Sequence, residues 1–269
     1  MSDTYRAFFG LSKEAFPAQI DIDEILVTPE VTGVKNRFDY AVRLGCSAVI
    51  TGDVGSGKST ALRYAASSLH ASEYKVFYVT ASTGSIIELY RQIVEELGID
   101  RSSTSRAVMT SIIKNEIREF VQGKKMKTVL IIDEASLLRM EVFAELHTLV
   151  QFEKDSRTWL PVILAGQPTL IDKLQYRTSI PFASRIVAKS HLEGLDINGM
   201  RSYLVHHLKL CGVDTNFFSD QAITAIHQGS GGLLRKANNL ARGSLIAAAA
   251  EKSMTVSAEH VRIASSEIF

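Results

Sequence analysis

The chain has 269 residues, of which 46% are hydrophobic and 22% are charged. These values describe an ordinary globular protein, long enough for one large domain or two small ones with a real core. The formal net charge of +1 neither favours nor excludes nucleic acid as a partner, because only a local basic patch would matter.

Secretion and membrane insertion are not expected from this sequence. The N-terminus carries an early acid and no long apolar region, so it lacks the features of a signal peptide. The most apolar late stretch, residues 240–250, is interrupted by Arg242 and Gly243 and is too short to cross a bilayer. Cys46 and Cys211 have no partner histidines at metal-binding spacing, and we interpret them as buried, reduced thiols of a cytoplasmic protein.

Residues 1–45 have an irregular pattern that ends in a helix-like run from Glu30 or Val31 to Leu44. A segment that precedes a phosphate-binding motif often folds over the base of a nucleotide, because a purine needs an apolar slot. Core packing is the alternative for any single aromatic residue of this segment. We expect residues 1–45 to lie near an adenine site.

A phosphate-binding motif follows. Residues 47–51 read as a short apolar strand, the next eight residues, GDVGSGKS, match the pattern G-x-x-x-x-G-K-[ST], and residues 60–69 are compatible with a helix. A strand, a glycine-rich turn and a helix start direct backbone N–H groups and the positive end of a helix dipole at one anion. A glycine-rich turn that matches by chance is the alternative. The expected nucleotide-binding residues are Gly52, Asp53, Val54, Gly55, Ser56, Gly57, Lys58, Ser59 and Thr60. In this motif Lys58 contacts the β- and γ-phosphates of a nucleotide and the Ser59 hydroxyl binds Mg²⁺.

A second buried strand is expected at residues 75–79, followed by helices over 83–97 and 107–121. Residues 128–134, TVLIIDE, then form a continuous apolar strand that ends in two acids. Groups at the carboxyl end of a strand face the ligand crevice of an open parallel sheet, so Asp133 and Glu134 should lie near the phosphate loop. Asp133 fits a Mg²⁺ ligand and Glu134 fits the base that activates an attacking water. The alternative is an acid pair that caps the next helix, expected at residues 141–150.

Another buried strand is expected at residues 161–165, and it ends in Gly166-Gln167-Pro168. Gln167 at this strand tip is a candidate sensor of the γ-phosphate or of the water, and a turn-capping role is the alternative. A helix is expected to begin at Leu170, and residues 182–189 carry Arg185 and Lys189 before the pattern changes near Glu193.

Beyond residue 193 only helix signals are present, over residues 198–211, 219–228, 233–250 and 257–265. Ser219 and Ser257 are expected N-caps. The sequence therefore predicts an α/β fold, a P-loop αβα sandwich with a parallel sheet over residues 1–192, followed by a small all-helical lid over residues 193–269.

The motifs in this order resemble those of the AAA+ ATPases. Within that class the chain is most similar to the branch that contains the general secretion pathway protein A (ExeA-type) ATPases and the Mu B and TnsC transposition ATPases. The resemblance covers nearly the whole chain and rests on these segments in combination: FFGLSKEAF, TGDVGSGKST, IIDEASLL, ILAGQPTL followed by KL, SRI, and GSGGLLRKANNLA.

The resemblance implies roles for further residues. Gln167 occupies the sensor 1 position, where many AAA+ proteins have asparagine. Arg185 matches the arginine finger that acts on the nucleotide of a neighbouring subunit, with Arg177 as a nearby rival, and Arg235 matches sensor 2. A surface salt bridge for Arg185 and a solvated charge for Arg235 are the alternatives from residue type alone. The implied cofactors are ATP and Mg²⁺, and the implied assembly is a ring or helical filament of this chain.

The resemblance implies an ATPase that binds double-stranded DNA and recruits or regulates a transposase or another recombination protein. Candidate DNA contacts are Lys124, Lys125 and Lys127 and the loops after Ser82 and at Leu138-Arg139; a solvated turn is the alternative for the lysines. The ExeA-type secretion proteins are usually longer, which favours a free cytoplasmic helper of a transposase; an isolated domain is the equal alternative. An ATPase that assists assembly of a secretion system is the second hypothesis. A small-molecule P-loop kinase is the third, and Glu134 and Arg235 argue against it.

Overall fold

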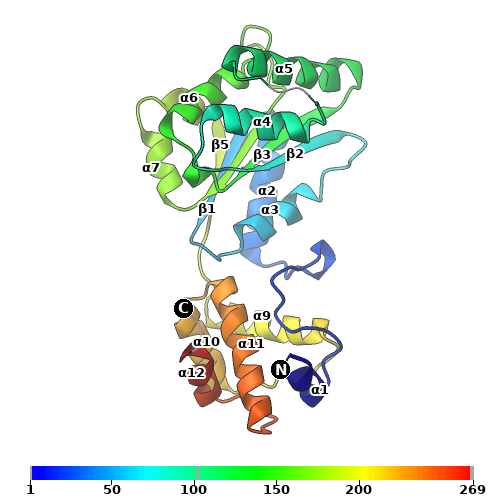
Figure 1. Cartoon of the computed structure of the whole chain (residues 1–269), viewed down its shortest axis with the longest axis vertical. Helices are drawn as coiled ribbons and strands as arrows, with labels where there is room; N and C mark the ends of the chain where they lie inside the picture. The colour runs from blue at the N-terminus through cyan, green and yellow to red at the C-terminus, as the bar shows by residue number, and fades with distance from the viewer. Residues whose placement is uncertain (1, 101–102, 267–269) are drawn as a thin grey trace. The chain divides into compact units, whose positions relative to one another are not determined.

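The computed structural model describes residues 2–100 and 103–266. The chain forms two compact units, coloured along the sequence in Figure 1. We call them the α/β unit, which comprises Pro29–Gly52 and Lys58–Leu192, and the helical unit, which comprises Met1–Thr28, Asp53–Gly57 and Glu193–Phe269.

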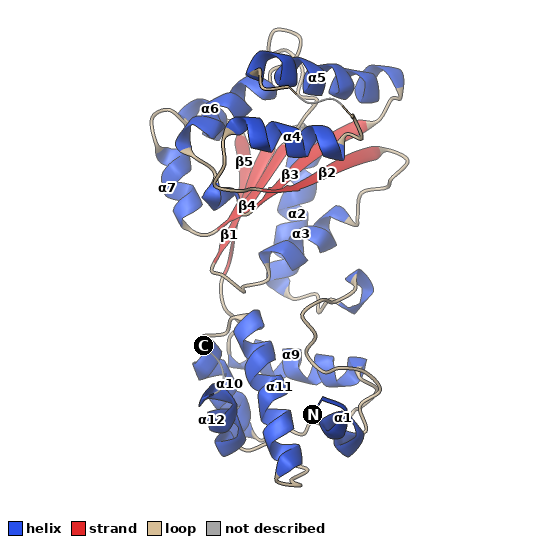
Figure 2. Cartoon of the chain, in the orientation of Figure 1, coloured by secondary structure: helices blue, strands red, loops and turns tan. Residues whose placement is uncertain are grey.

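A five-stranded parallel sheet forms the centre of the α/β unit (Figure 2). The strand order is β2-β3-β4-β1-β5. The strands are β1 (Ser47–Gly52), β2 (Tyr74–Thr80), β3 (Lys127–Asp133), β4 (Val162–Gly166) and β5 (Ile186–Leu192). Strands β1 and β4 are buried along their whole length, as is β3 after Lys127, which agrees with the continuous apolar runs expected of central parallel strands.

Helices cover both faces of this sheet. Successive residues of a strand point to opposite faces, so each strand contributes side chains to both helix layers. Phe38 of α2 and Leu62 of α3 pack with Ile131 on one face, whereas Ile93 of α4 and Phe143 of α6 pack with Ile132 on the other. The helices of this unit are α2 (Pro29–Leu44), α3 (Lys58–Ala66), α4 (Ile86–Glu96), α5 (Arg106–Arg118), α6 (Met140–Leu149), α7 (Thr169–Gln175) and α8 (Ile180–Ala183).

Three local features differ from the expected elements. Strand β5 carries Lys189, Ser190 and His191 in its second half, and its exposed positions alternate with partly or fully buried ones, so it lacks the apolar run of the other strands. Glu134 does not continue β3 but adopts a left-handed conformation with φ 53°, and a 3-10 turn over Ala135–Leu137 follows it. A turn of five residues with π-helical hydrogen bonding, Glu119–Gly123, also extends α5.

The helical unit contains the four helices expected after residue 193. They are α9 (Ile197–Leu210), α10 (Asp220–Ser230), α11 (Leu234–Ala250) and α12 (Ala258–Ser266). The hydroxyl of Ser219 accepts a hydrogen bond from the Ala222 amide, which confirms Ser219 as the N-cap of α10. None of the helices that the structure describes is long and apolar enough to cross a membrane.

The N-terminal segment packs with the helical unit, which differs from the expected grouping of residues 1–45 with the α/β domain. Helix α1 (Ser2–Phe9) and a 3-10 turn (Ile22–Glu24) belong to this segment. Phe9 packs against Phe217 at 4.7 Å between ring centroids, and Phe16 is fully buried beside Phe218. The segment therefore supplies core residues to the helices, and the grouping with the α/β domain begins only at Pro29.

Candidate nucleotide-binding site

The phosphate loop joins the end of β1 to the start of α3. Gly55 and Gly57 have φ values of +85° and +94°, which L side chains rarely adopt. The amide of Ser56 donates to the Asp53 carbonyl at 3.1 Å, and the buried Ser56 hydroxyl has no hydrogen-bond partner within the described ranges. A tight glycine-rich turn between a strand and a helix start agrees with the predicted phosphate loop.

The loop packs closely on the first turn of α11. The amide of Arg235 donates to the Gly55 carbonyl at 3.2 Å, and a Cβ at Gly55 would lie 2.9 Å from the Cβ of Arg235. A Cβ at Gly57 would lie 3.0 Å from Cδ1 of Leu234. These contacts explain why Asp53–Gly57 groups with the helical unit. They also bring Arg235, the predicted sensor 2 residue, to the loop, with its side chain exposed.

Lys58 and Ser59 form the first turn of α3. The Lys58 side chain is 6% exposed, and its ammonium group donates to the Gly52 carbonyl at 2.9 Å. A buried ammonium group at a helix N-terminus is a favourable position for a phosphate oxygen. The hydroxyl of Ser59 lies at the solvent-exposed side of the same turn, and it is a hydrogen-bond partner of Tyr78.

Asp133 ends β3 and is 5% exposed. The Tyr78 hydroxyl donates to Oδ2 of Asp133 at 2.7 Å, and the Glu134 amide donates to Oδ1 at 2.8 Å. Burial raises the pKa of Tyr78 and the hydrogen bond to Asp133 raises it further, so Tyr78 keeps its proton and remains a donor. No short motif marks Tyr78 in the sequence, because its contact with Asp133 follows from the pairing of β2 with β3.

Glu134 lies directly after Asp133 and behaves differently. Its side chain is only partly buried, and its carboxylate has no hydrogen bond or ion pair with any residue that the structure describes. Lys173 of α7 holds the turn after it, because its ammonium group donates to the carbonyls of Ser136 and Leu138 at 2.5 and 2.7 Å. The backbone of the turn is therefore fixed while the Glu134 carboxylate is free to bind a water.

Gln167 follows the carboxyl end of β4, between the ends of its neighbours β3 and β1 in the sheet. The preceding Gly166 pairs with Thr51 of β1, and a Cβ at Gly166 would lie 2.7 Å from the Ser136 amide nitrogen. Such close packing requires glycine at this position. The side-chain amide of Gln167 has no hydrogen-bond partner among the described residues. It is therefore available at the strand tip, as the sensor interpretation requires.

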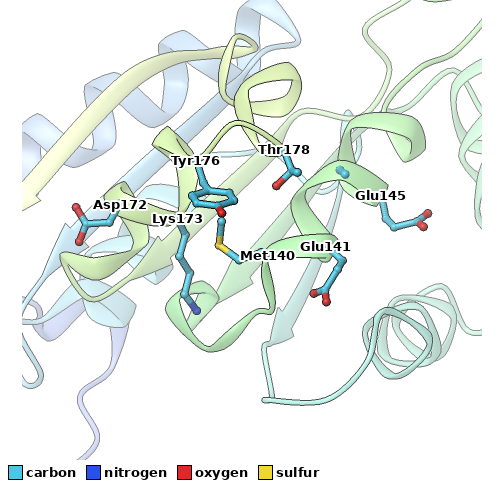
Figure 3. Close-up of a pocket in the computed structure, with 8 residues that line it drawn as sticks. Met140, Glu141, Glu145, Asp172, Lys173, Tyr176 and Thr178 are labelled. Atoms are coloured by element: carbon cyan, nitrogen blue, oxygen red, sulfur yellow. The ribbon is translucent and has the colours of Figure 1, made fainter.

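The two candidate arginine fingers differ in their surroundings. The Arg185 guanidinium donates to Oδ1 of Asp155 at 2.5 Å and to Nδ1 of His147 at 3.3 Å. Arg177 is exposed and, among the described residues, has no hydrogen-bond or ion-pair partner. It follows Tyr176, whose ring is 61% exposed at the rim of a hollow between α6 and α7 (Figure 3).

The candidate DNA contacts lie at opposite ends of the strands, one set at the amino ends and the other at the carboxyl ends. Lys127 begins β3 at the amino edge, and Lys124 is held over the Phe120 ring at 4.1 Å from the centroid. Ser82 follows β2, and the Arg139 loop follows the turn after β3, at the carboxyl edge. Arg139 Nε donates to the Thr83 carbonyl at 3.1 Å, so the two loops at this edge contact each other. The two sets therefore do not form one basic patch.

The residues present fit a triphosphate nucleotide with a divalent cation. A buried ammonium group and a buried loop hydroxyl without a partner among the described residues suit phosphate oxygens. A helix-start serine and a strand-end carboxylate provide the oxygen ligands that Mg²⁺ prefers.

Known proteins resemble this chain in sequence. A family model described as AAA domain matches residues 45–174. General secretion pathway protein A of Aeromonas hydrophila is 27% identical over 267 residues, which are 98% of this chain and 48% of that protein. The chain thus spans about half the length of this relative.

Solved structures of low sequence identity share the fold. The ORC2 protein of Aeropyrum pernix, solved as ADPNP and ADP complexes, is 17% identical with a TM-score of 0.69, over 95% of this chain and 72% of that one. The ORC1 protein of Aeropyrum pernix, solved in complex with DNA, is 16% identical with a TM-score of 0.67, over 91% and 67% of the two chains. The predicted fold, a P-loop α/β sandwich with a parallel sheet followed by a helical part, is confirmed.

We expect Gly55→Ala to weaken ATP binding by at least about tenfold, because the added Cβ meets Arg235 and displaces the loop backbone from a phosphate. Gly98→Ala is the matched control, since Gly98 has a φ of +74° and nothing within 4 Å of its added Cβ. Titration of a fluorescent ATP analogue measures both. Equal affinities in the two variants would contradict the close-approach role of Gly55.

Proposed function

We propose that this chain is an AAA+ ATPase that hydrolyses ATP with a water activated by Glu134. The observation that carries the proposal is the contrast between adjacent acids at the end of β3. Asp133 is buried and accepts two hydrogen bonds, whereas the Glu134 carboxylate has no partner among the described residues. A held carboxylate suits a metal site, and a free carboxylate beside it suits a general base.

The remaining residues of the site have roles that follow from phosphoryl transfer. Lys58 contacts the β- and γ-phosphates, and Ser59 and Asp133 hold Mg²⁺, which supplies positive charge for the phosphate oxygens when it is bound. Gln167 orients the water or contacts the γ-phosphate from the tip of β4. Arg235 adds positive charge beside the phosphate loop, where its own amide contacts Gly55.

We further propose that a neighbouring copy of the chain, in a ring or helical filament, supplies an arginine to each site. Arg177 is already exposed, and exposed apolar side chains lie next to it, Tyr176 at 61% and Ile180 at 52%. Such a surface is typical of one that a partner covers. Arg185 remains the counterpart of the arginine finger in the resembled family, and it must release Asp155 before it can reach another subunit.

Double-stranded DNA is the proposed partner, and the proposed role is recruitment or regulation of a transposase or another recombination protein in the cytoplasm. A protein of the same fold, ORC1 of Aeropyrum pernix, has been solved in complex with DNA. Similarity to Mu B and TnsC stays a prediction from the sequence motifs. Of the candidate contacts, the loops at Ser82 and Arg139 are preferred, because Lys124 and Lys127 contact aromatic residues of their own subunit.

Assistance in the assembly of a secretion system is the second candidate function. The match to general secretion pathway protein A over 98% of this chain favours it. Neighbouring genes would discriminate the two, since a transposase function predicts a recombinase gene and a secretion function predicts secretion components. Phosphate release without any acceptor molecule would exclude a small-molecule kinase.

Glu134→Gln should bind ATP with nearly normal affinity and hydrolyse it at least about 100-fold more slowly, because the amide cannot take a proton from water. Single-turnover phosphate release and nucleotide titration measure the two properties. Glu141→Gln on α6 is the control acid and should turn over normally. Unchanged turnover of Glu134→Gln would remove Glu134 from the proposed role.

Arg177→Ala and Arg185→Ala distinguish the two candidate fingers. The variant that lacks the true finger should lose about 1,000-fold or more in turnover. Turnover should return when that variant is mixed with Lys58→Ala subunits, which keep their arginines and supply one to the neighbouring site. If neither variant is rescued at any mixing ratio, the arginines do not act between subunits.

Double-stranded DNA should stimulate turnover, and turnover per subunit should rise with protein concentration. DNA affinity should fall steeply as salt increases, and Arg139→Ala should reduce the slope of log affinity against log salt by about one. Lys125→Ala, at the other edge of the sheet, is the control and should keep the slope. A slope near zero for the wild-type protein would argue against DNA as the partner.

A further inference from the structure

The hydroxyl of Tyr78 contacts both side chains that the proposed function assigns to the metal. It donates to Oδ2 of Asp133 at 2.7 Å, and Ser59 is its other hydrogen-bond partner. We propose that Tyr78 is a positioning residue that holds Asp133 and Ser59 in the arrangement that binds a divalent cation. This inference rests on the proposed function, because it assumes that these two residues bind Mg²⁺ together with ATP.

The pairing of β2 with β3 places Tyr78 at this point. Tyr78 lies opposite Ile131, and Thr80 lies opposite Asp133. Since side chains alternate along a strand, Tyr78, Ile131 and Asp133 share one face of the sheet, the face that α3 covers. Ser59 is the second residue of α3. The tyrosine ring therefore lies between a strand and a helix that each provide one proposed metal ligand.

Two donors fix the orientation of the Asp133 carboxylate. Tyr78 donates to one oxygen and the Glu134 amide donates to the other, so the carboxylate plane cannot rotate without loss of a hydrogen bond. Each oxygen keeps a lone pair for a metal ion or a metal-bound water. Outer hydrogen bonds of this kind orient metal ligands, and their removal commonly weakens metal binding by 10- to 100-fold.

A purely structural role for the Tyr78 hydroxyl is the alternative, and the chain provides a matched comparison. Tyr74 lies on the same strand and contributes to the same helix-covered face, but its hydroxyl accepts a hydrogen bond from Lys127 at the amino end of β3, at 3.3 Å. Loss of the Tyr74 hydroxyl removes an exposed hydrogen bond with Lys127, whereas loss of the Tyr78 hydroxyl removes its bonds with Asp133 and Ser59. Only the Tyr78 hydroxyl contacts proposed metal ligands.

The test compares Tyr78→Phe with Tyr74→Phe in the full chain. Titration of Mn²⁺ into the ATP-bound protein, followed by electron paramagnetic resonance of free Mn²⁺, gives the metal affinity without any turnover. We expect Tyr78→Phe to bind Mn²⁺ about tenfold more weakly and to need a correspondingly higher Mg²⁺ concentration for half-maximal turnover. Its ATP affinity in EDTA and its thermal unfolding midpoint should equal those of Tyr74→Phe, which should match the wild type throughout.

The outcomes separate the inference from the proposed function. Equal Mn²⁺ affinity in Tyr78→Phe and the wild type would overturn the positioning role while ATP hydrolysis still supports the proposed function. A wild-type protein that binds ATP equally well with and without divalent cation, and never turns it over, would overturn both. If Tyr78→Phe unfolds, Tyr78→Leu also lacks the hydroxyl and carries the same expected loss of metal affinity.

Discussion

The parallel pairing of β3, β4 and β1 is the constraint on which the α/β unit depends. Because their carboxyl ends reach the same edge of the sheet, Asp133 and Glu134, Gln167, and the start of the phosphate loop follow adjacent strands. Gly166 shows how tightly this edge is packed, since any side chain there would displace the backbone of the turn that follows Glu134. The chemistry of the site is therefore a consequence of strand order.

Much of this arrangement was predictable from residue patterns. The phosphate loop and the apolar strand that ends in Asp133 carry short-range signals, and the structure has them where the sequence places them. Strand β5 was missed because it is an outer strand whose apolar start is followed by Lys189, Ser190 and His191, so it has no continuous apolar run. Tyr78 was missed because its contact with Asp133 depends on the pairing of two strands, and the two residues are 55 positions apart in the chain. Packing of α1 with the later helices has the same long-range origin.

For Arg185 and Arg177, the sequence motif and the local structure favour different residues as the arginine finger. The motif favours Arg185, yet in the folded chain its side chain is only 21% exposed and its guanidinium is bonded to Asp155. An ion pair at the surface contributes little to stability, so it opposes release of the arginine only weakly. Arg177 has no such contact within the described residues and lies beside exposed apolar groups. Sequence position and local environment thus select different residues.

The bond between the Arg235 amide and the Gly55 carbonyl has a mechanical consequence. The backbone that surrounds an anion and the first turn of a 17-residue helix share one contact, so neither can shift without strain in the other. A change in the backbone of the loop would therefore reach the first turn of α11 directly, through one short stretch of main chain.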